Sequence, residues 1–272
     1  MQSGSSLPRL TRACAAVYLD ASDVAAAAGR HRYKPAEAVL AKVFRRSRPA
    51  TAAAVDSELE GSVAALATAA AATADLRAAI DEDRPEKRAR LVAEAAEAAA
   101  AARPEEAARL APRLAAELTS AVNTARGVRD EAAAVTAVPG FVPGDGRIKY
   151  KLFQVGQRLF KFGARVDGRC AATGQLLEVK NRQRGLFDRI PQYELIQVLV
   201  YLYVFEEPIC HFRQKYLDEL APDQQVRRDD DWLRRLLDDG LEAFARQLDR
   251  MDADEAFRRE VLREHPRGGR SA

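Results

Sequence analysis

Three side chains in the middle of the chain have the types and the spacing of a metal-assisted hydrolytic site. Glu178 and Lys180 are two residues apart, so on a strand they share one face, while Leu177 and Val179 share the other. Among the eight lysines, Lys180 alone has an acidic residue two positions before it. Asp167 stands eleven residues before Glu178, at the end of another predicted strand and ahead of a glycine turn.

These three groups can meet only if two strands are neighbours. If residues 160–166 pair with residues 176–180, two carboxylates and an ammonium converge on one face. Hard divalent cations prefer oxygen, and Mg²⁺ takes one or two carboxylates while keeping waters and substrate phosphate oxygens. Such an ion neutralises a phosphodiester and activates water, and a nearby ammonium stabilises developing negative charge. The pattern favours hydrolysis of a nucleic-acid backbone with Mg²⁺ or Mn²⁺; an ordinary salt bridge on a half-exposed strand is the structural alternative.

The elements that must position these residues follow an α/β order. A helix capped by Ser22 and ended by Gly29, a helix after Pro35 and a helix over residues 119–135 precede a three-stranded meander. A proline-led apolar run over residues 191–205 predicts a buried helix, followed by a strand and by an amphipathic helix over residues 229–264. We therefore expect an α/β fold with a central mixed β-sheet flanked by helices.

Composition excludes several classes of protein. Cys14, Cys170 and Cys210 are widely spaced and the three histidines are scattered, so neither a disulfide framework nor a zinc site is expected. No stretch has the roughly 20 strongly apolar residues of a membrane span, and no secretory leader is evident, so we expect a soluble intracellular protein, cytoplasmic or nuclear in a host cell. The net charge is +3, and 35 arginines against eight lysines permit a phosphate-rich partner without demonstrating one.

Four segments, in order, resemble one branch of a known family. The stretch VDGRCAATGQLLEVKNR is similar to the catalytic core of the PD-(D/E)xK nuclease superfamily. Three flanking stretches narrow the resemblance to the YqaJ-type viral recombinases, the phage lambda exonuclease-like branch: LDASDVAAAAGRHRYKPAEAV, ARGVRDEAAA and YELIQVLVYLYVF. Together they cover about half of the chain. Leu199 stands where the family has a second glutamine.

The resemblance implies roles for eight residues. Asp167 and Glu178 would be metal ligands with the Val179 carbonyl as a third, Lys180 the catalytic lysine, and Glu131 a further ligand approaching from its helix. Gln197 would assist at the edge of the active site or touch the DNA. Ser22, first of all a helix cap, would bind phosphate, and Arg126 would contact the DNA backbone or brace Glu131. Arg182 and Arg184, in the basic stretch after Lys180, are expected to contact phosphate. Tyr193, Tyr201, Tyr203 and Phe205 are interpreted as core packing rather than as a platform for bases.

The same resemblance divides the chain into four parts. Residues 1–48 are expected to form the N-terminal helical part of the nuclease domain, 49–118 an Ala-rich helical insertion, 119–228 a restriction-endonuclease-like core, and 229–272 a C-terminal helical segment with a disordered tail.

The resemblance also implies an activity and partners. The leading hypothesis is a Mg²⁺- or Mn²⁺-dependent 5′-to-3′ exonuclease acting on double-stranded DNA in viral or phage-type recombination or repair. The implied partners are double-stranded DNA, further copies in a trimeric ring and a single-strand annealing protein, with no membrane. A structure-specific endonuclease using the same residues is one alternative, and a non-catalytic nucleic-acid binding protein on a nuclease scaffold is another.

Overall fold

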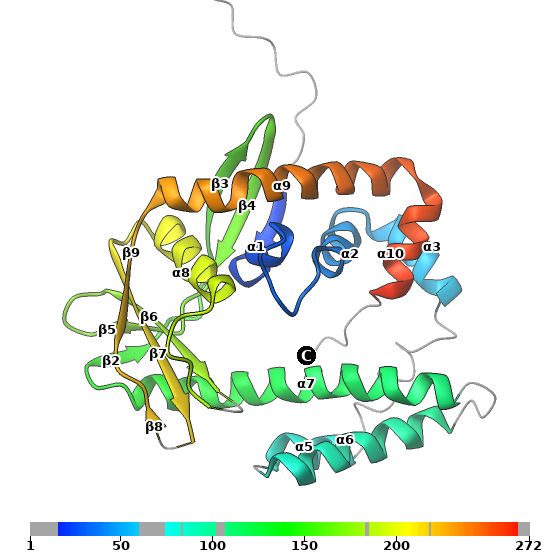
Figure 1. Ribbon diagram of the computed structural model, residues 1–272, viewed down its shortest axis with the longest axis horizontal. Helices are drawn as coiled ribbons and strands as arrows, with labels where there is room; N and C mark the ends of the chain where they lie inside the picture. The colour runs from blue at the N-terminus through cyan, green and yellow to red at the C-terminus, as the bar shows by residue number, and fades with distance from the viewer. Residues whose placement is uncertain are drawn as a thin grey trace, which may run out of the picture.

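The computed structural model describes residues 16–59, 74–82, 84–101, 107–182, 185–217 and 219–265 (Figure 1). Its helices and strands follow one another along the chain in this order: β1 (Val17–Asp20), α1 (Ala21–Ala27), α2 (Ala36–Ser47), α3 (Pro49–Leu59), α5 (Ala74–Asp81), α6 (Pro85–Ala100), α7 (Ala107–Thr136), β2 (Phe141–Pro143), β3 (Lys149–Val155), β4 (Arg158–Ala164), β5 (Gly168–Cys170), β6 (Leu176–Asn181), α8 (Gln192–Phe205), β7 (Ile209–Tyr216), β8 (Glu219–Leu220), β9 (Gln224–Arg227), α9 (Asp230–Ala253) and α10 (Glu255–Glu264).

The strands form two sheets, each of mixed direction. In the first, with the order β1-β4-β3, β1 runs parallel and β3 antiparallel to β4. In the second, with the order β2-β5-β6-β7-β8, β6 and β7 are parallel and β9 also pairs with β7. Helices flank the sheets (Figure 1), which confirms the expected α/β class with mixed strands.

The expected pairing of residues 160–166 with residues 176–180 is wrong. β4 pairs with β1 and β3, and the chain then leaves that sheet through residues 165–167. β5, which follows immediately, makes the antiparallel contact with β6 through Gly168 and Leu177. Asp167 therefore still stands beside β6, but at the junction between the two sheets.

β6 is covered on both faces, and different helices cover them. Leu177 and Val179 pack against Ala134 and Val135 of α7, whereas Leu176 belongs to the core that includes α8. A Cβ at Gly168 would lie 2.8 Å from a methyl carbon of Val135, so a glycine is required there for α7 to approach the sheet this closely. Because side chains alternate along a strand, residues 176, 178 and 180 face α8.

The first part of the chain differs from the sequence prediction in two details. The short strand β1 was not predicted, and α1 begins directly after it with Asp20, not Ser22, as its N-cap. Gly29 ends α1 as predicted, with φ at +66°, and the amides of Gly29 and Arg30 return to the carbonyls of Ala26 and Ala25. The second helix follows Pro35 as expected.

The Ala-rich region divides between two cores. α3 packs into the main core through Ala52 and Val55. α5, α6 and α7 share a second, smaller cluster that includes Val92, Leu114 and Leu118. We call α5, α6 and the part of α7 that packs on them the arm (Figure 1). α7 is one continuous helix of 30 residues, so it runs through the expected boundary at residues 118 and 119.

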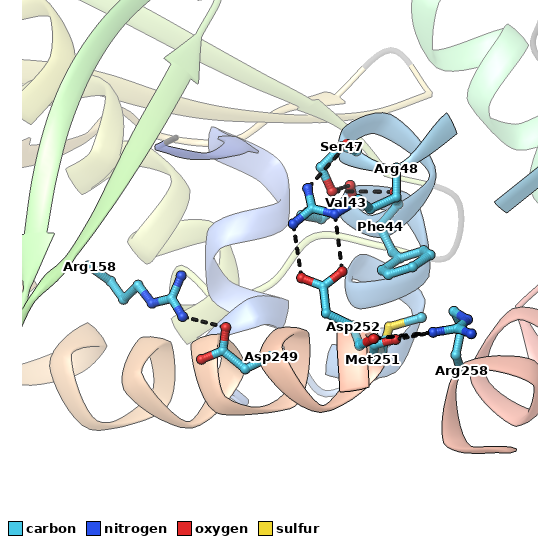
Figure 2. A network of polar contacts seen from close by, with 9 residues as sticks. All are labelled: Val43, Phe44, Ser47, Arg48, Arg158, Asp249, Met251, Asp252 and Arg258. Carbon is cyan, nitrogen blue, oxygen red and sulfur yellow. Dashed lines mark hydrogen bonds and ion pairs between the residues drawn. The ribbon is translucent and has the colours of Figure 1, made fainter. Parts of the chain in front are cut away.

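The C-terminal region closes over the N-terminal helices. The expected helix is divided at Asp254 into α9 and α10, and each begins with an aspartate whose carboxylate accepts a backbone N–H. Arg48, at the end of α2, donates to both carboxylate oxygens of Asp252 at 3.1 and 2.9 Å, and Arg158 of β4 pairs with Asp249 (Figure 2). Arg258 donates to the Met251 carbonyl at 2.9 Å. These contacts attach α9 to both α2 and β4.

Candidate active site

Asp167 reaches β6 through its carboxylate. Its Oδ2 accepts a hydrogen bond from the Val179 N–H at 2.8 Å, just beyond the last residue pair of β5 and β6. The N–H and C=O of one strand residue point to the same edge. The Val179 carbonyl therefore faces the side on which Asp167 lies, as a third ligand would require.

Glu178, Lys180 and Gln197 form one polar network on the α8 side of β6. The Lys180 ammonium pairs with Glu178 Oε1 and donates to Gln197 Oε1 at 3.2 Å. Gln197 Nε2 donates to the same Glu178 oxygen at 3.1 Å and also to the Tyr201 hydroxyl. The structure thus brings together Asp167, Glu178, Lys180 and Gln197, four of the residues singled out in the sequence.

The network is partly shielded from solvent: Gln197 is half-buried and the Lys180 side chain is 25% exposed. Glu178 is 1% exposed. Burial favours the neutral amine of Lys180, but the carboxylates of Glu178 and Asp167 outweigh it and raise the pKa of Lys180 above its usual value. Lys180 is therefore a cation at neutral pH, suited to stabilising negative charge rather than to accepting a proton.

One carboxylate oxygen of the network is left unsatisfied by the described residues. Glu178 Oε2 is buried and has no hydrogen-bond partner among the residues that the structure describes. A buried acceptor without a partner is costly, and a hard cation is a ligand that would satisfy it. Oxygen donors from Asp167, Glu178 and the Val179 carbonyl are the kinds that Mg²⁺ or Mn²⁺ prefers, so the residues present fit such an ion. The described residues contain no cluster of three or more His, Cys, Asp or Glu side chains that could hold a metal.

Three polar residues of the mainly apolar helix α8 lie on one face. Glu194, Gln197 and Tyr201 follow the i, i+3, i+7 spacing, which places them together. Glu194 and Tyr201 were not predicted as part of the site. This spacing in the sequence was the signal that could have found them, because a carboxylate in an apolar helix needs a buried partner.

The structure gives Arg182 a different role from the one that the sequence predicted. It was expected to contact phosphate, but its guanidinium donates two hydrogen bonds of 2.7 Å to the Glu194 carboxylate and a third of 2.7 Å to Gln214. The side chains of Arg182 and Glu194 are 9% and 7% exposed. Arg182 therefore fixes α8 to the end of β6 and has no free fork for DNA.

Arg126 and Ser22 are not part of this network. Arg126 is 7% exposed and donates to the carbonyls of Ile80 and Glu82 at 2.8 and 2.9 Å, so it attaches α7 to the end of α5 rather than facing a ligand. Ser22 is exposed in the first turn of α1. Glu131 lies on α7, which packs beside the sheet as its role requires, but its side chain is outside the described residues, as is Arg184.

Comparisons with known proteins add little. No family model and no curated protein matches the chain. A solved structure named SSO0001 is 14% identical, covers 52% of this chain and 69% of its own, and superposes with a TM-score of 0.38. A likeness this weak supports no conclusion about fold or function. Any functional assignment therefore depends on the residues of the site.

Proposed function

We propose that this protein is a divalent-cation-dependent deoxyribonuclease with Asp167, Glu178 and Lys180 as its catalytic set. The observation that supports this is their convergence: two acids from the junction of β4, β5 and β6 stand beside a half-buried ammonium, with one carboxylate oxygen left without a described partner. The four sequence segments that resemble YqaJ-type recombinases supply the choice of DNA as substrate.

Each residue has a separate task in this proposal. A divalent cation bound by Asp167, Glu178 and the Val179 carbonyl would supply charge neutralisation and Lewis acidity at the scissile phosphate. Lys180 holds a positive charge beside the phosphate and stabilises the negative charge that develops during in-line attack by water. Gln197 donates to Glu178 and accepts from Lys180, so it fixes the two charged groups relative to each other. Hydrolysis then needs no covalent bond to the protein.

Cleavage assays with three variants test the proposal. Asp167→Asn, Glu178→Gln and Lys180→Met should each lower Mg²⁺-dependent hydrolysis of duplex DNA by at least about 100-fold, because each removes a charge that acts in the transition state. Glu242→Gln, at an exposed position on α9, is the matched control and should cleave like the wild type. Circular dichroism and thermal unfolding establish that the variants remain folded.

The outcomes separate the alternatives. Absence of cleavage with every divalent ion, despite salt-dependent DNA binding, would favour a non-catalytic binding protein. Preference for linear over circular duplex, with nucleotides released from 5′ ends, supports the 5′-to-3′ exonuclease, whereas equal cutting of both forms supports the endonuclease. The described residues include no helix that could cross a membrane.

Cation binding can be measured without turnover. Mn²⁺ titration followed by electron paramagnetic resonance should show a site in the wild type that is lost in the Asp167→Asn and Glu178→Gln variants and retained in the Glu242→Gln variant. If a variant that lacks both carboxylates still binds Mn²⁺ as tightly as the wild type, the assigned ligands are wrong, even if the protein cleaves DNA.

A further inference from the structure

Three aromatic rings meet where the loop between α1 and α2 touches the beginning of α8. The His31 and Tyr193 ring centroids are 4.4 Å apart with 36° between the planes, and Tyr33 meets Tyr193 edge-on at 6.1 Å. Tyr193 is half-buried and packs against the main core, and Tyr201 and Tyr203 are buried, as the sequence predicted. Tyr33 is 68% exposed and presents an aromatic surface to solvent.

The loop that carries two of these rings is held in one conformation. Gly29 turns the chain at the end of α1. His31 Nδ1 accepts the backbone N–H groups of Tyr33 at 3.2 Å and Lys34 at 3.0 Å, and the Lys34 ammonium pairs with the buried Asp23. A ring placed by such contacts loses little conformational entropy when a ligand stacks on it.

The rings lie one helical turn from the candidate active site. Tyr193 precedes Gln197 by four residues on α8, a rise of about 6 Å along the helix axis. One strand of duplex DNA advances about 3.4 Å per nucleotide. A base on the rings would therefore be within about two nucleotides of a phosphate held beside Lys180.

The charges around the rings suit a polyanion. Arg30 and Arg32 are exposed, and neither forms an ion pair with a described residue. The Arg32 guanidinium lies 5.4 Å from the Tyr33 ring centroid. A planar guanidinium next to an aromatic ring is a combination that binds a base by stacking and its phosphate by charge.

We propose that His31, Tyr33 and Tyr193 form a stacking site for an unpaired base of DNA, close to the point where the backbone is cleaved. The proposal rests on the proposed function for the identity of the ligand as DNA. It specifies the substrate class further: a duplex end with a frayed or single-stranded nucleotide, rather than a fully paired helix. Stacking tolerates any base, so the site would impose no sequence preference.

Binding without cleavage tests this site. Hairpin duplexes with a four-nucleotide 5′ or 3′ overhang carrying 2-aminopurine are titrated with the full-length protein in EDTA. Affinity and quenching of 2-aminopurine fluorescence are recorded, and the same duplexes with an abasic analogue at that position serve as the reference.

The expected result is a loss that depends on both ring and base. Tyr33→Ala should weaken binding roughly 5- to 100-fold and abolish quenching, since an aromatic platform contributes that much per stacked base. Tyr33→Phe should retain both, because it keeps the ring. Tyr150→Ala, at a half-exposed tyrosine on β3, is the matched control and should bind like the wild type.

Other outcomes overturn the proposal. If Tyr33→Ala binds like the wild type, or loses as much affinity for the abasic duplex as for the intact one, the rings only fasten the loop to α8. If the wild type does not bind these duplexes, the stacking site fails as well. If the protein stacks a base but does not cleave DNA, the stacking site is supported and the nuclease proposal is rejected. The two proposals can therefore fail separately.

Discussion

Two bidentate arginine–carboxylate pairs lie in opposite environments. Arg182 and Glu194 are joined by two hydrogen bonds of 2.7 Å, and their side chains are 9% and 7% exposed. Arg48 and Asp252 are joined by bonds of 3.1 and 2.9 Å at 50% and 40% exposure (Figure 2). The first pair joins β6 to α8 at the candidate active site, and the second joins α2 to α9.

The difference shows why the site is built from buried pairs. Water can replace either partner of the exposed pair, so that pair contributes little to stability. Neither partner of the buried pair can be solvated, so each is bound to the other and the position of α8 is specified. Gln197 is carried on that helix, and its hold on Glu178 and Lys180 depends on the helix staying in register.

Removing one partner of the buried pair gives the largest expected effect. Arg182→Ala leaves Glu194 as an uncompensated buried charge and should lower the free energy of unfolding by about 3–5 kcal/mol. Urea denaturation measures the loss. The double variant Arg182→Met with Glu194→Leu removes both charges and should lose less. A loss below about 1 kcal/mol in Arg182→Ala would mean that the pair behaves like an exposed one.

Removing Gln197, which contacts Glu178 and Lys180, tests function more than stability. Gln197→Ala removes the group that orients Glu178 and Lys180, and DNA hydrolysis should slow roughly 100-fold because small displacements of reacting groups have costs of that order. Single-turnover rates at saturating DNA measure this effect. Tyr201→Phe, which removes only the hydroxyl bonded to Gln197, is the graded comparison and should slow the reaction less. Unchanged rates in both would remove α8 from the mechanism.

His31 is half-buried, between the buried and the exposed pair, and its contribution to stability should depend on pH. Burial and the nearby Lys34 charge lower the pKa of His31 below the usual 6.5, outweighing attraction by Glu194 and Asp23. As the pH falls below about 6.5, the unfolded chain binds a proton that the folded chain does not, so stability is lost. His31→Asn keeps an acceptor for the loop amides without titrating. Unfolding measured at several pH values should be less pH-dependent in this variant; equal slopes would contradict the assignment.

The exposed pair should give the smallest effect. Arg48→Ala is expected to lower the free energy of unfolding by no more than about 1 kcal/mol, and the difference from the wild type should shrink at 1 M NaCl because salt screens exposed charges. Thermal and urea unfolding at low and high salt measure both quantities. A loss near that of Arg182→Ala would show that exposure does not distinguish the two pairs.

The sequence predicted the center of the site because local rules determine it. Alternation on a strand places Glu178 and Lys180 on one face, and a proline-led apolar run of 14 residues in α8 has to be buried. The gathering of Asp167 with them was predicted correctly for a partly incorrect reason. The pairing runs through β5, a strand of three residues too short to recognise beside the longer β4.

What the sequence could not give depends on contacts between distant residues. Arg182 in a basic stretch resembles a solvated loop residue until Glu194, twelve positions later, is known to face it. Arg126 in an Ala-rich helix resembles a surface cation, yet Ile80 and Glu82 supply its acceptors from the end of another helix. In both cases burial of the charge follows from tertiary packing, which a local pattern does not contain.

Because α7 is one continuous helix, it connects the arm mechanically to strand β6. Its 30 residues form a rod of about 45 Å. At one end of α7, Leu114 and Leu118 pack against α5 and α6. At the other end, Ala134 and Val135 pack against the face of β6 opposite Glu178. A displacement of α5 and α6 is therefore transmitted through α7 to the strand that carries Glu178. A deletion that ends at residue 118 would cut this helix between its two packing sites.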